Sequence, residues 1–135
     1  MTSTRNRAAL PLPRLSASEL VAAPPDEGAG AWAGAPSAVL AGDTIYLAYR
    51  LRRPIGEGRG YRNVIAASTD GVRFEEVAWL ERDRFAADSL ERPALVLTPD
   101  GRWRAYVSCA TPASKHWRVD LVEAATPGGW PRRPR

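Results

Sequence analysis

The stretch Pro93-Ala-Leu-Val-Leu-Thr-Pro-Asp-Gly-Arg-Trp-Arg-Ala-Tyr-Val-Ser108 decides the fold of this 135-residue chain, because it has the pattern of two short strands joined by a turn. Its middle, Pro99-Asp-Gly101, is typical of a tight turn, in which glycine takes a positive φ at little cost. After the turn, Trp103, Ala105 and Val107 alternate with arginine and tyrosine. This alternation has the period of a strand with one buried face, so the stretch predicts a β-hairpin.

The chain contains this hairpin pattern twice. Pro36 lies 57 positions before Pro93, and at that offset residues 36–49 align with residues 93–106 without a gap. Identical residues fall at both ends, within the strands and at the turn, and the same offset aligns residues 67–71 with residues 124–128. So many matches without an insertion indicate a structural repeat. A repeat of this length built from short strands suits a β-propeller blade better than a helical array.

Each repeat predicts a series of short antiparallel strands. The expected strands of the first repeat lie at 37–40, 44–51, 63–68 and 73 to about 80. Those of the second lie at 94–97, 102–109 and 118–124. The glycine-rich segment 52–60 lacks the strand–loop–helix setting of a phosphate-binding loop, so we expect a surface loop there. Four such strands in sequence make one propeller blade.

The repeat divides the chain into three predicted parts. Residues 1–30 form a flexible leader, in which 16–23 are expected to make one helical turn before two prolines. Residues 31–130 form two blades, about 31–80 and 88–130, and residues 131–135 form a basic tail. The outer strand of the second blade should begin near residue 131, where two prolines in five residues oppose a strand. Because two blades cannot close a ring, we expect a fragment of a longer protein in preference to an assembly of several copies.

The charge distribution argues against a nucleic-acid partner. The chain has 18 arginines and one lysine, and its net charge is +4. Six of these arginines lie in the leader and the tail: Arg5, Arg7, Arg14, Arg132, Arg133 and Arg135. Without them, 13 basic residues face 15 acidic ones, which leaves a net charge of −2. A nucleic-acid-binding domain carries its basic patch on the folded surface, which this distribution does not provide.

Cysteine, histidine and hydropathy patterns predict a cytoplasmic protein without a cofactor. Cys109 has no partner for an internal disulfide, and its place after an alternating strand favours a small packed residue over a nucleophile. One histidine, His116, makes no metal site by itself. No apolar run is long enough to span a membrane, and residues 8–13 are too short and too rich in proline for a secretory signal. We therefore expect no metal and no membrane contact.

Around Ser89-Leu-Glu-Arg-Pro93 and the hairpin that follows, the sequence resembles the five-bladed propeller glycoside hydrolases. These are families 43 and 32 and their relatives, including the mannoside phosphorylases. The segment Ala67-Ser-Thr-Asp-Gly-Val-Arg-Phe74 is similar to the turn between outer strands in such blades. The resemblance spans about residues 31–130, or two of five blades. It implies an all-β fold, a partial five-bladed β-propeller, and action on the glycosidic bonds of oligo- or polysaccharides.

The resemblance also implies a catalytic residue. In these enzymes the acidic catalytic residues sit where the innermost strands begin, and the general acid is a Glu two residues before a Pro, as Glu91 is before Pro93. The base or nucleophile is an Asp directly before the Pro of an early blade, where this chain has Ala35 before Pro36. A glycosidase needs two carboxylates. Three alternatives therefore stay open: a glycosidase with Glu91 as general acid, a carbohydrate-binding relative without cleavage, and an inactive truncated fragment.

Four further residues are candidates for contact with a carbohydrate substrate: Trp32, Arg50, Asp88 and Trp117. Trp32 and Trp117 are candidate stacking platforms for a sugar ring, although burial between blades is the commoner fate of tryptophan. Arg50, at the end of a strand, is a candidate to hold a substrate oxyanion, with a solvated strand end as the alternative. Asp88 is a candidate to orient Glu91, with a turn-forming role as the alternative. Open sheet edges would also favour self-association.

Overall fold

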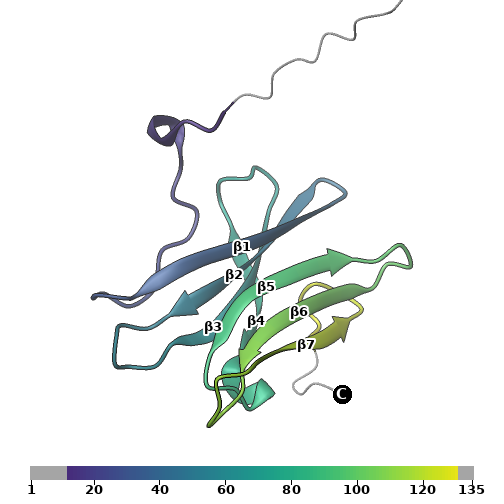
Figure 1. Ribbon diagram of the computed structural model, residues 1–135. Coiled ribbons are helices and arrows are strands. Elements are labelled where there is room, and N and C mark those ends of the chain that lie inside the picture. Colours follow the sequence, from purple (N-terminus) through teal and green to yellow (C-terminus); the bar gives the residue numbers. More distant parts are fainter. Residues whose placement is uncertain (1–11, 131–135) are drawn as a thin grey trace, which may run out of the picture.

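The computed structural model describes residues 12–130, and this part of the chain consists of two antiparallel β-sheets without an α-helix (Figure 1). The predicted all-β class is therefore confirmed. The basic tail and the first eleven residues of the leader lie outside the described residues. Between residues 12 and 130 no helix has the length and apolar character needed to cross a membrane.

The strands of each sheet follow one another in chain order. The first sheet contains β1 (Trp32–Ala41), β2 (Thr44–Arg52), β3 (Gly60–Ser68) and β4 (Glu75–Glu81). The second contains β5 (Leu90–Leu97), β6 (Trp103–Ala110) and β7 (Trp117–Ala124). All seven predicted strands are present, although β1 begins at Trp32 instead of residue 37 and β5 begins at Leu90 instead of residue 94. The loop between β2 and β3 is largely exposed, as predicted.

Two short 3-10 turns complete the described structure. The first, η1 (Leu15–Ala17), begins earlier and is shorter than the turn expected at 16–23. It buries no residue, and no side chain caps its N-terminus, so little favours a longer helix. The second, η2 (Arg82–Phe85), joins the two sheets and places Phe85 in the core. Further along the leader, the amide of Ile55 donates a hydrogen bond to the carbonyl of Ala29 at 2.8 Å. The end of the leader thus lies against the loop between β2 and β3.

The two sheets pack face to face, with β1 beside β5 (Figure 1). Residues from both sheets form a shared core: Ala48, Ile65, Ala78, Leu95, Trp103 and Ala124. Tyr46 and Trp103 meet edge to face across the interface, with ring centroids 4.7 Å apart. The amide of Leu95 also donates to the hydroxyl of Ser37 at 3.0 Å, which ties the two first strands together. Burial of apolar surface between the sheets therefore holds the strands of both in place.

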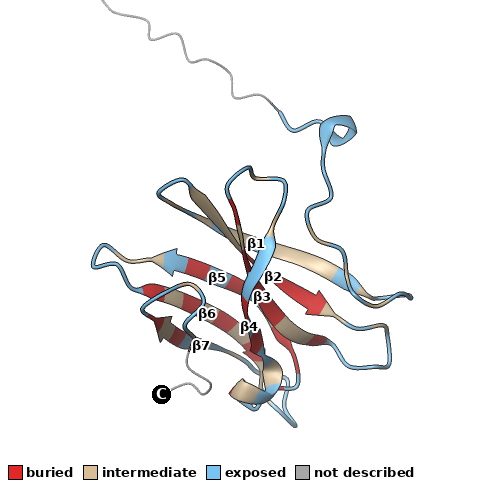
Figure 2. Cartoon of the chain, turned by 180° about the vertical axis from the view of Figure 1, so that it is seen from behind, coloured by how far each residue is buried: buried red, intermediate tan, exposed pale blue. Residues whose placement is uncertain are grey.

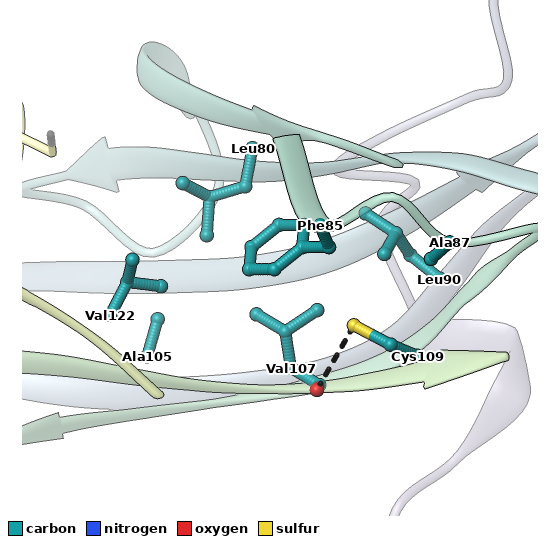
Figure 3. Packing of buried hydrophobic residues seen from close by; sticks show 8 residues of the cluster. All are labelled: Leu80, Phe85, Ala87, Leu90, Ala105, Val107, Cys109 and Val122. Carbon is teal, nitrogen blue, oxygen red and sulfur yellow. Dashed lines mark hydrogen bonds between the residues drawn. The ribbon is translucent and has the colours of Figure 1, made fainter. Parts of the chain in front are cut away.

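Cys109 belongs to a second core cluster beneath η2 (Figure 3). Its thiol donates a hydrogen bond to the carbonyl of Val107 at 3.5 Å and packs beside Leu90 and Phe85. Burial raises the pKa of the Cys109 thiol to about 12, so it stays protonated at neutral pH. The expectation that Cys109 is a small packed residue is confirmed.

The 57-residue offset holds for the first strands of the two sheets. Val39 packs against the shared core, whereas Val96, its counterpart at that offset, lies on the outer face of the second sheet. Neighbouring blades of a propeller stack with the same face in the same direction. A residue of the first sheet that faces the second sheet should therefore correspond to a residue of the second sheet that faces away from the first. β1 and β5 are thus equivalent strands at the predicted offset.

In the second strands the gapless alignment is wrong. Ala48 and Ala105 are counterparts at the 57-residue offset, yet both are buried between the sheets and so lie on opposite faces of their own blades. The structural equivalent of Ala105 is Leu47, which packs on the other face of the first sheet. A shift of one residue moves every side chain of a strand to the opposite face, and this shift separates β2 from β6.

The two hairpin turns explain this shift. The first hairpin closes on Gly42 and Asp43, between the paired residues Ala41 and Thr44. The second closes on residues 99–101, because the amide of Thr98 donates to the carbonyl of Arg102 at 2.9 Å. One extra turn residue, accommodated by a positive φ at Gly101, therefore changes the face that β6 presents. The sequence identities in this strand do not mark equivalent positions.

Among residues 12–130, the outer face of the second sheet includes several exposed apolar residues (exposed parts of the chain are pale blue in Figure 2). Its exposed apolar residues are Val96, Trp117, Val119 and Leu121. The equivalent face of the first sheet is covered by the second sheet. A further sheet is the natural cover for such a face, because an exposed apolar sheet surface favours association.

Asp70 organises the turn between β3 and β4. Its carboxylate accepts the amides of Val72 at 2.9 Å and Arg73 at 2.8 Å, and the hydroxyl of Ser68 at 2.9 Å. These hydrogen bonds lower the pKa of Asp70 to about 2, because they favour the ionised form. The predicted Asp-Gly turn is present, with Gly71 at a positive φ.

We expect Asp70→Ala to lower the melting temperature at pH 7, because the turn loses three hydrogen bonds to the carboxylate. The folded pKa lies below the unfolded value of 3.8, so this stabilisation is present above pH 4 and disappears as the pH falls towards 2. Thermal melts between pH 7 and pH 2 should show the difference from wild type shrinking. A difference that stays constant over this range would contradict the prediction, and Asp43→Ala serves as the turn-aspartate control.

Candidate functional site

Four residues from four strands meet where β1, β3 and β5 begin and β2 ends. These residues, here called the Glu91 cluster, are Trp32, Arg50, Asn63 and Glu91. Nη1 of Arg50 forms an ion pair with Oε2 of Glu91, and its guanidinium carbon lies 4.9 Å from the ring centroid of Trp32. Nδ2 of Asn63 donates to the backbone carbonyl of Glu91 at 3.1 Å. The packing of the two sheets thus brings together residues 59 positions apart.

A β-bulge sets the direction of Glu91. Leu90 pairs with Cys109, but Pro93 pairs with Val107, so β5 has one residue more than β6 between these pairs. A bulge bends its strand and redirects a side chain, and proline is tolerated there because the ladder is interrupted. The local sequence Glu-Arg-Pro therefore suits this position.

β1 has a bulge near the corresponding place. Gly34 pairs with Arg50 and Ser37 pairs with Ala48, which again leaves one extra residue on the first strand. Within this bulge Ala35 has a φ of 55°. Both innermost strands therefore have a bulge near their start, but at the 57-residue offset, at which Glu91 corresponds to Gly34, the bulge of β1 lies one residue later than that of β5.

The absence of a side chain at Gly34 makes room for Trp32. A Cβ atom added at residue 34 would lie 2.9 Å from two carbons of the Trp32 ring, which is closer than carbon atoms approach. The indole therefore lies against the bulge and beneath the guanidinium of Arg50. Trp32 remains 47% exposed in this position, so part of its ring is open to a ligand.

The beginning of β3 fixes the backbone that carries Glu91. The amide of Gly60 donates to the hydroxyl of Ser89 at 2.9 Å, and a Cβ atom at residue 60 would lie 1.9 Å from the carbonyl oxygen of Leu90. Ser89 and Asn63 are both completely buried. Residues 60 and 63 therefore position the segment Ser89–Glu91 through contacts with its backbone.

Burial and neighbouring charges define the electrostatics of the cluster. The side chain of Arg50 is 4% exposed and that of Glu91 is 29% exposed. Burial, followed by repulsion from Arg52, Arg59 and Arg92, lowers the pKa of Arg50. A buried guanidinium is tolerated when a carboxylate compensates its charge, and Glu91 has this role here. The pair leaves the Glu91 carboxylate oriented at the beginning of β5 and partly accessible from solvent.

Three of the five predicted site residues lie together, and two do not. Glu91, Arg50 and Trp32 form the cluster. Trp117 pairs with Ala110 at the start of β7, which is separated from β5 by β6. Asp88 is exposed, and the hydrogen bonds that the structure records for it use its backbone amide and carbonyl, not its carboxylate. Asp88 and Trp117 are therefore outside the cluster.

Sequence reasoning did not single out Asn63 or Ser89. Asn63 opens the apolar run Asn63-Val-Ile-Ala-Ala67, and Ser89 precedes Leu90. A buried polar side chain is costly unless it is hydrogen-bonded, so polar residues next to apolar strand runs are a signal for such contacts. The signal was present, but the partners lie 28 and 29 residues away in the chain.

Comparison with solved structures identifies the architecture. A family 43 glycoside hydrolase from Xanthomonas citri, in complex with xylotriose, matches 77% of this chain with a TM-score of 0.63 and 14% identity. A structure from glycoside hydrolase family 130, described for enzymes that target β-1,2 mannosidic linkages in Candida mannan, matches 76% with a TM-score of 0.58 and 19% identity. A β-xylosidase matches 78% with a TM-score of 0.62 and 12% identity. No protein-family model and no curated protein sequence matches the chain.

These neighbours are five-bladed β-propeller enzymes, and the chain spans about a third of their length: 33%, 31% and 37%. The chain therefore has the fold of part of a five-bladed β-propeller, the fold that these glycoside hydrolases share. The predicted architecture and the predicted resemblance are confirmed. At identities between 12% and 19%, the likeness concerns the fold alone.

Proposed function

We propose that this chain carries part of the sugar-binding site of a glycoside hydrolase-like propeller, with Glu91 as the general acid. The observation that carries the proposal is the Glu91 cluster, in which a carboxylate, a guanidinium and an open indole meet at the start of an innermost strand. Carboxylates cleave glycosidic bonds, and aromatic rings combined with hydrogen-bonding groups bind sugars. The fold of the solved neighbours supports the same class of protein.

Each member of the cluster has a role in this proposal. The Trp32 ring stacks on the apolar face of a sugar, and Arg50 donates hydrogen bonds to sugar oxygens and orients Glu91. Glu91 donates a proton to the leaving-group oxygen as the glycosidic bond breaks. A general acid must carry a proton, whereas an ion pair uses the carboxylate in its ionised form, so the substrate has to separate Glu91 from Arg50 before the proton is transferred.

Carbohydrate binding without cleavage is the second candidate function. Ala35 occupies the position at which the resemblance implies the second carboxylate, and it lies in the bulge of β1. The ion pair between Arg50 and Glu91 also suits a site that orients a ligand without chemistry. The full chain, incubated with xylotriose and with a β-1,2-linked mannobiose, distinguishes the two candidates, because only a glycosidase releases monosaccharide.

Trp32→Ala tests the location of the sugar site. We expect this substitution to weaken binding of xylotriose about tenfold, because stacking on an aromatic ring contributes on the order of 1 kcal/mol or more. Trp117→Ala is a matched control, since Trp117 is 49% exposed and Trp32 is 47% exposed. Isothermal titration calorimetry on both variants gives the comparison. Equal losses in both, or a loss in Trp117→Ala alone, would contradict the proposed location.

A further inference from the structure

The surroundings of the Glu91 cluster are strongly basic. Residues 50–62, which span the end of β2, the loop and the start of β3, contain five arginines and one glutamate. A sixth arginine, Arg92, directly follows Glu91 in the bulge of β5. Without the six arginines of the leader and the tail, the net charge of the chain is −2. The concentration of guanidinium groups at one end of the sheets is therefore a local feature.

Several of these arginines lack a carboxylate. Arg50 pairs with Glu91, and Arg62 pairs with Glu81 at 2.7 Å. Arg52, Arg59 and Arg92 form no ion pair with any residue between 12 and 130. Repulsion from these three side chains contributes to the lowered pKa of Arg50. The positive charge around the cluster therefore exceeds what its own carboxylate balances.

Buried donors at the same place have no acceptor. Arg50 is 4% exposed, and its Nε atom is buried without a hydrogen-bond partner among the described residues. The Nε atom of Arg52 is in the same situation, two residues along the same face of β2. Buried polar groups are almost always paired, so two such donors beside uncompensated positive charge suit an acidic acceptor from outside residues 12–130.

We propose that the Glu91 cluster recognises an acidic sugar, whose carboxylate accepts hydrogen bonds from Arg50 and Arg52 while Arg59 and Arg92 supply further positive charge. The inference rests on the proposed function, since it assigns a substrate class to the same sugar site. Guanidinium groups bind carboxylates through two parallel hydrogen bonds, which gives both affinity and orientation. A uronic acid unit is the sugar with this chemistry.

The test compares two ligands that differ only at C6: methyl β-glucuronide, which carries a carboxylate there, and methyl β-glucoside, which carries a hydroxymethyl group. The readout is a titration of the full chain followed by the NMR signal of the Trp32 indole N–H. We expect the glucuronide to bind at least about tenfold more tightly, because hydrogen bonds between charged groups are stronger than those between neutral ones. The advantage should decrease as sodium chloride is raised from 50 to 500 mM.

Arg59→Gln and Arg92→Gln should each reduce the preference for the glucuronide severalfold without affecting folding, since both residues are exposed. Arg102→Gln, in the turn before β6, is the control, because it removes one exposed positive charge at a distance from the cluster. Loss of preference in all three variants alike would show that net charge alone is responsible and would overturn the inference.

The possible outcomes separate this inference from the proposed function. Equal affinity for glucuronide and glucoside would overturn the acidic-sugar inference and leave the sugar site in place. Binding of neither ligand, and of no xylotriose, would overturn both. Inorganic phosphate that binds as tightly as the glucuronide would assign the arginines to a free oxyanion and overturn the assignment to a sugar carboxylate.

Discussion

Replacing Gly60 by alanine is expected to lower the free energy of unfolding by about 3 kcal/mol or more, the upper end of the cost of forcing extra atoms into a packed core. A Cβ atom at residue 60 would lie 1.9 Å from the carbonyl oxygen of Leu90 and 3.0 Å from Cδ of Arg50. The nearer atom belongs to the backbone, which cannot rotate away as a side chain can. Leu90 is completely buried and Ser89 is hydrogen-bonded to Gly60, so β3 and β5 would have to separate.

Gly42→Ala is the matched control for this prediction. Gly42 has a positive φ of 59° but nothing lies within 4 Å of an added Cβ, so the cost there is conformational strain of roughly 1–2 kcal/mol. Gly60 is outside the left-handed region, so its cost is steric. Urea denaturation followed by tryptophan fluorescence gives both values. A Gly60→Ala variant at least as stable as Gly42→Ala would show that β3 and β5 are less closely apposed than the structure indicates.

Glu91→Gln is expected to reduce turnover of a glycoside about 100-fold or more, because general acid catalysis typically contributes at least that factor. The substitution keeps the size of the side chain and a hydrogen-bond acceptor for Arg50, but it removes the ionisable proton. Sugar affinity should therefore be largely retained. A glycoside with an activated leaving group needs no proton and should lose much less of its rate.

Glu123→Gln provides a closely matched control. Glu123 is 34% exposed, close to the 29% of Glu91, and it pairs with Arg104 at 2.9 Å; its partner is a partly exposed arginine on β6, and Glu123 itself lies on β7. Circular dichroism melts of both variants separate lost catalysis from lost stability, since an unpaired Arg50 would destabilise the fold. Unchanged turnover in Glu91→Gln would exclude this residue as the acid. A wild-type chain that binds sugars without cleaving them would instead favour the binding function, in agreement with Ala35.

The candidate site was only partly accessible from the sequence. Glu91 and Arg50 were predicted separately, from a motif and from a strand end, and the structure adds that they are paired. Trp32 and Trp117 had equal standing in the sequence, because neither has a local signal for its neighbours. Only the strand order separates them, since it places β1 beside β5 and β7 at the far edge of its sheet. Ser89 and Asn63 were missed for the same reason.

The sequence by itself determined the strands, the turns and the blade architecture, because alternating polarity and Asp-Gly turns act over a few residues and do not depend on distant contacts. It also located the Glu–Arg–Pro segment directly before a predicted strand at 94–97, and the structure extends that strand back to Leu90. Tertiary structure decided which face of each strand is covered. In β6, one additional residue in the turn at 99–101 reversed the face that the repeat implied, and Ala105 became buried against the first sheet. The number of residues in a turn and the face of the next strand that the core buries are determined together. A local sequence pattern alone therefore does not determine the register of the strands.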